Sequence, residues 1–246
     1  MHFRSRLYFL LATLCVTYPG TGFAQPETPL KTKYETRRNH DPNGIGKFYM
    51  GREIAFVMTH EGAGWLDRTE REKEESPRHL LEALKIKPTD VIIDFGAGSG
   101  FYTLRLARQA PKGKIIAVDI QPEMLAIFER KKKAESITNI ELIRCTENDP
   151  KLKTGSADLI VLVDVYHELS SPYEVTRLLA QALKPGGRLV LVEFRLEDPD
   201  VPIKLVHKMS EKQALHELDQ IPELEYVETL QDLPWQHIVI HRRKRP

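Results

Sequence analysis

The sequence has little cysteine and almost no net charge. Its two cysteines are Cys15 and Cys145, and Cys15 lies in a segment that we expect to be removed. A disulfide framework within one mature chain is therefore excluded, as is any site that needs two or more thiolates. The 36 lysines and arginines nearly balance the 35 aspartates and glutamates, leaving a formal net charge of +1. This balance gives the chain no general attraction to nucleic acid or anionic lipid.

Long apolar runs are missing too. No apolar stretch of the sequence approaches the roughly 20 residues that are needed to span a bilayer. The hydrophobic content of 41% is nevertheless too high for a disordered chain. The composition therefore predicts a globular protein with a core of ordinary size.

The first residues have the composition of an export signal. Two arginines precede the ten apolar residues 7–16, and the small residues Gly22 and Ala24 follow at the spacing of a cleavage site. This order predicts a secretory signal peptide over residues 1–24. We expect the protein to be exported, to the periplasm or outside the cell, and to stay in the cytoplasm only if the signal is not used.

Two further segments precede the regular part of the chain. Residues 25–43 are polar, contain three prolines and show no periodicity, so they predict a linker. Residues 44–86 predict a helical extension, with a helix over Tyr49–His60 and a capping box at Thr69–Glu72. This extension is the expected lid over a ligand site, and its candidate contact residues are Tyr49, Met50, Trp65, Arg68 and Arg71.

Residues 87–246 alternate between strand and helix patterns. The expected strands are 91–95, 114–118, 140–143, 159–163, 188–194, 224–229 and 237–241. The expected helices are 101–109, 122–134, 171–183 and one that begins at Ser210. Strands separated by helices imply right-handed crossovers and a mostly parallel sheet that is covered on both sides. The sequence therefore predicts one doubly wound α/β domain of seven strands behind an N-terminal helical extension.

A glycine-rich turn follows the first strand of this domain, where doubly wound folds bind their ligands. It reads D-F-G-A-G-S-G over Asp94–Gly100. The glycines let the backbone approach a ligand without interference from a Cβ atom. The helix over 101–109 then directs its N-terminal N–H groups at the ligand, which suits a negative group such as a carboxylate.

Two classes of cofactor compete for this turn. The dinucleotide pattern G-x-G-x-x-G fails because Phe101 stands where the third glycine belongs. Asp94 would also repel a pyrophosphate, whereas it would attract an ammonium group. S-adenosylmethionine carries an ammonium and a carboxylate but no phosphate, so the turn favours this cofactor. Asp119, at the end of the second strand, can accept hydrogen bonds from both ribose hydroxyls, although NAD sites share this feature.

Four motifs in succession give the chain a family resemblance. They are Asp94–Gly100, Asp119, the stretch Asp158–Asp164 and the stretch Leu183–Val192. In order and spacing they resemble the motifs of class I S-adenosylmethionine-dependent methyltransferases, a Rossmann-like fold, and more narrowly an uncharacterised bacterial group with export signals. The resemblance implies that the last two strands form an antiparallel hairpin.

The resemblance also implies which residues bind the cofactor. The first motif would hold the methionine part, the second-strand acid the ribose, and the stretch after the fourth strand would face the transferred methyl group. Where the family often has an aspartate on the adenine amino group, this chain has Thr146 and then Glu147, and either side chain can accept that bond. The expected cofactor-binding residues are Asp94, Gly96, Ala97, Gly98, Gly100, Asp119, Ile120, Thr146, Glu147 and Asp164.

The expected catalytic residues follow the fourth strand. Methyl transfer depends mainly on holding the nucleophile and the methyl group in line. A general base is needed only where the acceptor must lose a proton early, and His167, next to Tyr166, has a suitable reference pKa of about 6.5. The alternative is that His167 caps or packs beside the cofactor.

The acceptor is inferred only by elimination. The sequence lacks the D/N-P-P-Y motif of DNA amino-methylation and the thiols of arsenite methylation. This leaves a small-molecule or lipid-like acceptor and makes nucleic acid unlikely. No metal site is expected, because His237 and His241 lack a third ligand in the sequence. The alternatives to a methyltransferase are an NAD-dependent oxidoreductase and a non-catalytic nucleoside-binding protein on the same scaffold.

Overall fold

The computed structural model describes residues 34–245. The expected signal peptide, residues 1–24, and residues 25–33 of the expected linker lie outside the described residues. Within the described part of the chain, no helix combines the length and the apolar character needed to cross a membrane.

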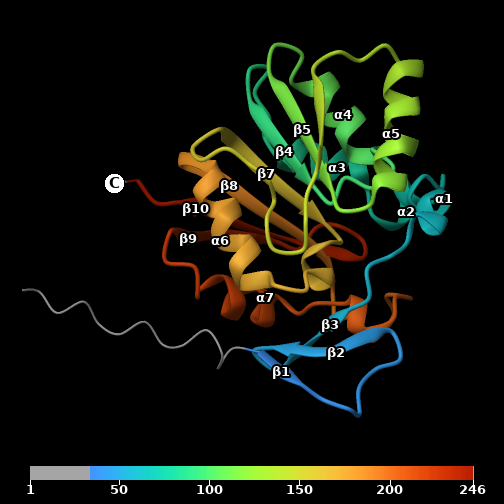
Figure 1. The fold of residues 1–246 in the computed structure, drawn as a ribbon, viewed down its shortest axis with the longest axis vertical. Helices are drawn as coiled ribbons and strands as arrows, with labels where there is room; N and C mark the ends of the chain where they lie inside the picture. The colour runs from blue at the N-terminus through green and yellow to red at the C-terminus, as the bar shows by residue number, and fades with distance from the viewer. Residues whose placement is uncertain (1–33, 246) are drawn as a thin grey trace, which may run out of the picture. The chain divides into compact units, whose positions relative to one another are not determined.

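A seven-stranded sheet forms the centre of the described chain (Figure 1). Its order is β6-β5-β4-β7-β8-β10-β9, and all neighbouring pairs are parallel except the two that involve β10. The strands are β4 (Val91–Phe95), β5 (Lys114–Asp119), β6 (Ile140–Arg144), β7 (Ala157–Val163), β8 (Leu183–Phe194), β9 (Leu224–Leu230) and β10 (Gln236–Arg243). The predicted doubly wound fold and its antiparallel terminal hairpin are confirmed.

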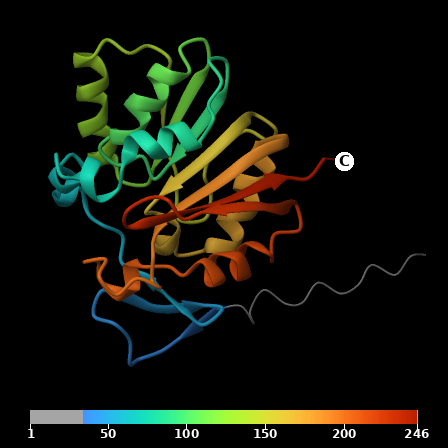
Figure 2. The ribbon, with the colours of Figure 1, turned by 180° about the vertical axis from the view of Figure 1, so that it is seen from behind.

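Alternate residues of the strands pack into two cores, one on each face of the sheet. Ile93 and Ile160 belong to the core beneath α6 (Pro172–Ala182) and α7 (Glu211–Leu218). Their neighbours Ile92 and Leu159 belong to the opposite core. That core lies beneath α3 (Pro77–Ala83), α4 (Phe101–Gln109) and α5 (Pro122–Ala134). Figures 1 and 2 show the two helical layers from opposite sides. Strands buried on both faces explain the continuous apolar runs of the sequence.

The N-terminal extension differs from its prediction. No helix forms over Tyr49–His60; instead β2 (Gly44–Tyr49) and β3 (Arg52–Ala55) form an antiparallel hairpin. Met50 and Gly51 both have positive φ in the tight turn, and such a turn favours a hairpin over a helix. The predicted helix is therefore wrong, because the alternation of buried and partly buried residues in β2 has the period of a strand.

The predicted linker is too long at its C-terminal end. Tyr34–Thr36 forms β1, which pairs antiparallel with β2 in a separate three-stranded sheet. Tyr34 fixes this strand, since its ring lies 5.1 Å from that of Tyr49 and its hydroxyl donates to Glu174 over 2.5 Å. The polar composition of residues 25–43 gave no sign that Tyr34 contacts Tyr49 and Glu174.

Short helices complete the extension, as predicted. They are the 3-10 turn η2 (His60–Gly62), α1 (Ala63–Leu66), α2 (Arg71–Glu74) and α3. The expected capping box at Thr69–Glu72 does not form, because no side chain of the described residues caps α2. At α7, which begins where predicted, Ser210 accepts the N–H of Gln213 over 3.1 Å.

Candidate functional site

A cavity of about 690 Å³ lies at the carboxyl ends of four parallel strands. The residues that follow β4, β5, β6 and β7 line it, together with parts of the N-terminal extension and residues 202–204 and 207. This is the position at which doubly wound sheets bind their ligands. Eight predicted site residues line the cavity: Gly96, Gly98, Asp119, Ile120, Thr146, Glu147, Asp164 and His167.

The glycine turn after β4 is shaped by its close neighbours. Gly96, Gly98 and Gly100 all have positive φ, which side chains rarely tolerate. A Cβ atom on Gly96 would lie 2.4 Å from Val165, and one on Gly100 would lie 2.2 Å from the Phe128 ring. Gly96 and Gly98 therefore present backbone to the cavity, whereas Gly100 and Ala97 do not line it and serve the packing of the turn.

Asp119 ends β5 and reaches across to the glycine turn. One carboxylate oxygen accepts the N–H of Gly98 over 2.8 Å, and the other accepts the N–H of Gln121 over 2.8 Å. Burial raises the pKa of this carboxyl, against the effect of the backbone N–H groups. Asp119 is thus a fixed acceptor on the cavity wall, and the ribose contact predicted for it stays a prediction.

Asp94 lies behind the cavity wall. Its carboxylate is buried and accepts the hydroxyl of Thr103, in α4, over 2.5 Å. Burial raises its pKa to about 6. Asp94 therefore connects β4 to α4, and the structure does not bring it into the lining of the cavity.

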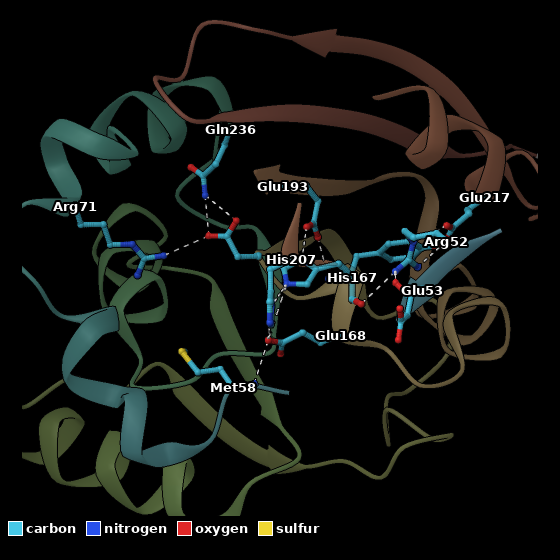
Figure 3. Close-up of polar contacts among 12 residues, drawn as sticks. Arg52, Glu53, Met58, Arg71, His167, Glu168, Glu193, His207, Glu217 and Gln236 are labelled. Atoms are coloured by element: carbon cyan, nitrogen blue, oxygen red, sulfur yellow. Dashed lines mark hydrogen bonds and ion pairs between the residues drawn. The ribbon is translucent and has the colours of Figure 1, made fainter. Parts of the chain in front are cut away.

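A buried arginine from the N-terminal extension, Arg71, also lines the cavity. Arg71 pairs with Glu75 over 2.5 Å and donates to the carbonyl of Leu66 over 2.9 Å. Its guanidinium also lies 3.9 Å from the carboxylate of Asp164. Asp164 follows β7 and receives the amide of Gln236 on both oxygens, over 2.9 and 2.7 Å (Figure 3). Burial raises its pKa well above the ordinary value.

Only some of the other residues predicted for the lid and for the adenine contact line the cavity. Trp65 and Arg71 line the cavity, whereas Tyr49, Met50 and Arg68 do not. Thr146 and Glu147 both line it and are both exposed. The adenine contact predicted for this pair stays a prediction for either residue.

His167 lies on the 3-10 turn η3 (Tyr166–Glu168) and is held by Glu193. Its Nδ1 lies 2.5 Å from Oε2 of Glu193, near the end of β8, and both side chains are buried. Burial lowers the pKa of His167, but the Glu193 carboxylate and its hydrogen bond outweigh this effect and raise it overall. The other ring nitrogen, Nε2, lies 3.2 Å from Nδ1 of His207.

Tyr166 does not reach the cavity. Its ring is buried beneath the guanidinium of Arg52, and its hydroxyl bonds to Glu217, which with burial raises its pKa well above the ordinary value. Neighbouring side chains of a 3-10 turn point in different directions, and of this pair only His167 lines the cavity. The catalytic role predicted for Tyr166 stays a prediction.

Sequence reasoning missed several partners of these residues. Glu193 is the one acidic residue in the apolar stretch Leu189–Phe194, and its place near the carboxyl end of β8 was an available signal. Gln236 and His207 carry no such signal, because they enter the site from segments far along the chain.

The comparisons with known proteins agree with this geometry. A family model described as a methyltransferase domain matches residues 86–239. The chain belongs to this family. The match and the shared fold confirm the predicted resemblance to class I S-adenosylmethionine-dependent methyltransferases.

Individual relatives of the methyltransferase domain match parts of it. A tRNA U34 carboxymethyltransferase from Desulfotalea psychrophila is 31% identical over 124 residues, covering 50% of this chain and 37% of the relative. A malonyl-[acyl-carrier protein] O-methyltransferase from Halalkalibacterium halodurans is 28% identical over 199 residues, covering 76% of this chain and 66% of the relative. The chain thus spans well under half the length of the first of these relatives.

One solved structure shares the fold along its whole length. It is a SAM-dependent methyltransferase from Aquifex aeolicus, with a TM-score of 0.72 and 23% identity. The similarity covers 76% of this chain and 100% of that protein.

Proposed function

We propose that the protein binds S-adenosylmethionine in this cavity and transfers its methyl group to a small-molecule or lipid-like acceptor. The observation that carries the proposal is the placement of Asp119 beside the glycine turn, with Arg71 and Asp164 on the same cavity. Together they offer an acceptor for a ribose and one charge of each sign for an amino-acid group.

The ribose part fits Asp119. Each carboxylate oxygen already accepts one backbone N–H, and each retains further acceptor capacity. The N–H of Gly98 fixes the direction of the carboxylate before a ligand arrives. A fixed acceptor loses less entropy on binding, so it contributes more to affinity than a mobile one.

The amino-acid part fits Arg71 and Asp164. The guanidinium of Arg71 can pair with a carboxylate, which arginine binds with well-defined geometry. The Asp164 carboxylate, 3.9 Å from that guanidinium, can accept hydrogen bonds from the ammonium group of the same amino-acid part. Asp94 supports this arrangement from behind, since its carboxyl holds the start of α4 through Thr103.

The chemistry requires little of the protein beyond position. The bound cofactor would supply a methyl group activated by the sulfonium. The cavity residues would hold the acceptor in line with that methyl group, which contributes on the order of 7–11 kcal/mol to catalysis in well-oriented reactions. Glu193 holds Nδ1 of His167, and Nε2, in the protein without a bound metal ion, is the group that would accept a proton from the acceptor.

The mouth of the cavity favours an acceptor with apolar surface. Phe56, Val57 and Trp65 line the cavity and are 52%, 43% and 39% exposed. Such side chains at a site entrance commonly contact an apolar ligand. The two relatives described above are named for different substrates, a tRNA and an acyl carrier protein. Because these names disagree, neither substrate is assigned to this chain.

Calorimetric titration with S-adenosylmethionine and NAD⁺ would test the cofactor. We expect saturable binding of the first and none of the second. Formation of S-adenosylhomocysteine with phenol, thiol, amine and carboxylate acceptors would then test catalysis. Tight binding with no product from any acceptor class would favour the non-catalytic alternative, and binding of NAD⁺ alone would refute the proposal.

A further inference from the structure

Three side chains of types that bind metal ions meet on the cavity wall. Nε2 of His167 lies 3.2 Å from Nδ1 of His207. Oε1 of Glu168 lies 4.0 Å from the first nitrogen and 3.8 Å from the second. One ligand atom from each residue lies within 4.8 Å of the other two. Figure 3 shows the three side chains turned toward one another.

Neighbouring groups fix the orientation of two of these ligands. Glu193 binds Nδ1 of His167 over 2.5 Å, so Nε2 is the ring nitrogen that faces His207 and Glu168. The N–H of Met58 donates to Oε1 of Glu168 over 3.1 Å. A carboxylate behind a histidine is the usual outer partner of a metal ligand, because it fixes the ring and increases its basicity.

The spacing suits a tetrahedral ion. Zinc–nitrogen bonds of about 2.0–2.1 Å at tetrahedral angles separate two ligand nitrogens by about 3.3 Å. The two imidazoles are already at this separation. Glu168 would need to approach by roughly half an ångström, which a small side-chain rotation supplies.

The charges around the cluster also favour a cation. Glu168 and Glu193 are both paired with imidazoles. The nearby guanidinium of Arg52 is committed to Glu217, over 2.7 and 2.9 Å. A divalent cation that displaces the proton of His167 would be balanced by the carboxylates of Glu168 and Glu193 in this largely buried region.

We propose that His167, Glu168 and His207 bind a divalent transition-metal cation, and that Zn²⁺ fits this set of two nitrogens and one carboxylate best. All three residues line the cavity, so the fourth coordination position opens into it. A catalytic type of site keeps such an open position, whereas a structural site closes it. That this position takes a donor atom of the acceptor rests on the proposed function; the binding of the ion does not.

A simple hydrogen bond between His167 and His207 would explain their 3.2 Å contact equally well. The two interpretations differ over Glu168. The hydrogen-bonded pair does not need its carboxylate, whereas a metal site does. Glu168→Gln preserves the shape of the side chain and weakens only its ability to bind an ion.

The test uses the full chain without a polyhistidine tag, stripped with a chelator and titrated with ZnCl₂. We expect one ion per chain, and Co²⁺ in its place should give the intense visible absorption of a tetrahedral site. His207→Ala should weaken Zn²⁺ binding at least 100-fold, and Glu168→Gln about 10-fold to 100-fold. His216→Ala, at an exposed histidine, is the matched control and should bind as the parent does.

Thermal unfolding and S-adenosylmethionine titration of each metal-free variant would check that it folds. The proposal is overturned if the parent takes up no stoichiometric ion, or if Glu168→Gln binds Zn²⁺ as tightly as the parent. Loss of S-adenosylmethionine binding with intact Zn²⁺ binding would instead refute only the proposed function. The sequence places His237 and His241 on one strand without a third ligand, so it predicted no metal site. His207 joins His167 only through the fold.

Discussion

The carboxylate of Asp119 accepts the backbone N–H of Gly98 over 2.8 Å. The end of β5 therefore holds the glycine turn that follows β4. The two elements line one side of the cavity and cannot move independently while this bond persists. The acceptor for the ribose and the backbone that approaches the methionine part are thereby fixed together.

Gly100→Ala should destabilise the fold through a steric clash. Its φ is +82°, and a Cβ atom would lie 2.2 Å from the Phe128 ring. Backbone strain of roughly 1–2 kcal/mol and overpacking of typically 1–3 kcal/mol should both lower the free energy of unfolding, measured in urea. Gly155→Ala is the matched control, since its φ is +63° but nothing lies within 4 Å. Equal losses in the two variants would contradict the assigned clash.

His241 should make the protein sensitive to acid. Burial lowers its pKa from 6.5 to about 4, and neither ring nitrogen has a hydrogen-bond partner among residues 34–245. Between pH 6.5 and pH 4 the unfolded chain therefore binds a proton that the folded chain does not, so stability falls as the pH falls. The full shift corresponds to about 3 kcal/mol.

Urea unfolding at several pH values between 7 and 4 measures this effect. His241→Leu should lose less stability than the parent over that interval. His216→Leu, at an exposed position, should retain the parent's slope. A His241→Leu variant that is as acid-sensitive as the parent would show that other groups cause the loss.

Arg71→Lys should weaken recognition of the ligand's carboxylate specifically. A lysine retains the positive charge but lacks the paired donors of the guanidinium. We expect S-adenosylmethionine affinity to fall about 10-fold to 100-fold, the range that corresponds to a charged hydrogen bond of roughly 1.5–3 kcal/mol. The affinity for the decarboxylated analogue should be nearly the same in parent and variant. If both ligands lose affinity equally, Arg71 acts by holding Glu75 and Asp164 instead.

The fold could be predicted from the sequence wherever the pattern is local. The strand Val91–Phe95 and the helix Phe101–Gln109 match the structure residue for residue, because buried strands and amphipathic helices leave strong patterns in the sequence. The hairpin of β2 and β3 was missed because Met50 stands before Gly51 where such turns usually have Asn or Asp. Its β1 neighbour is held by Tyr34 through contacts with residues far along the chain.

The candidate site was predictable along one edge of the sheet only. Asp119 and Asp164 follow strand ends, so topology alone places them together. Which way Tyr166 points is decided by Arg52 and Glu217, on other elements. The pairing of His167 with Glu193 and His207 likewise depends on tertiary packing, which no local pattern contains.

Titration of S-adenosylmethionine into the full chain by calorimetry tests the central claim most directly. Asp119→Ala removes the ribose acceptor and frees the N–H of Gly98, so affinity should fall at least about 30-fold, the equivalent of about 2 kcal/mol. Asp200→Ala, at an exposed aspartate, is the control and should bind as the parent does. An Asp119→Ala variant that binds the cofactor as tightly as the parent would contradict the account.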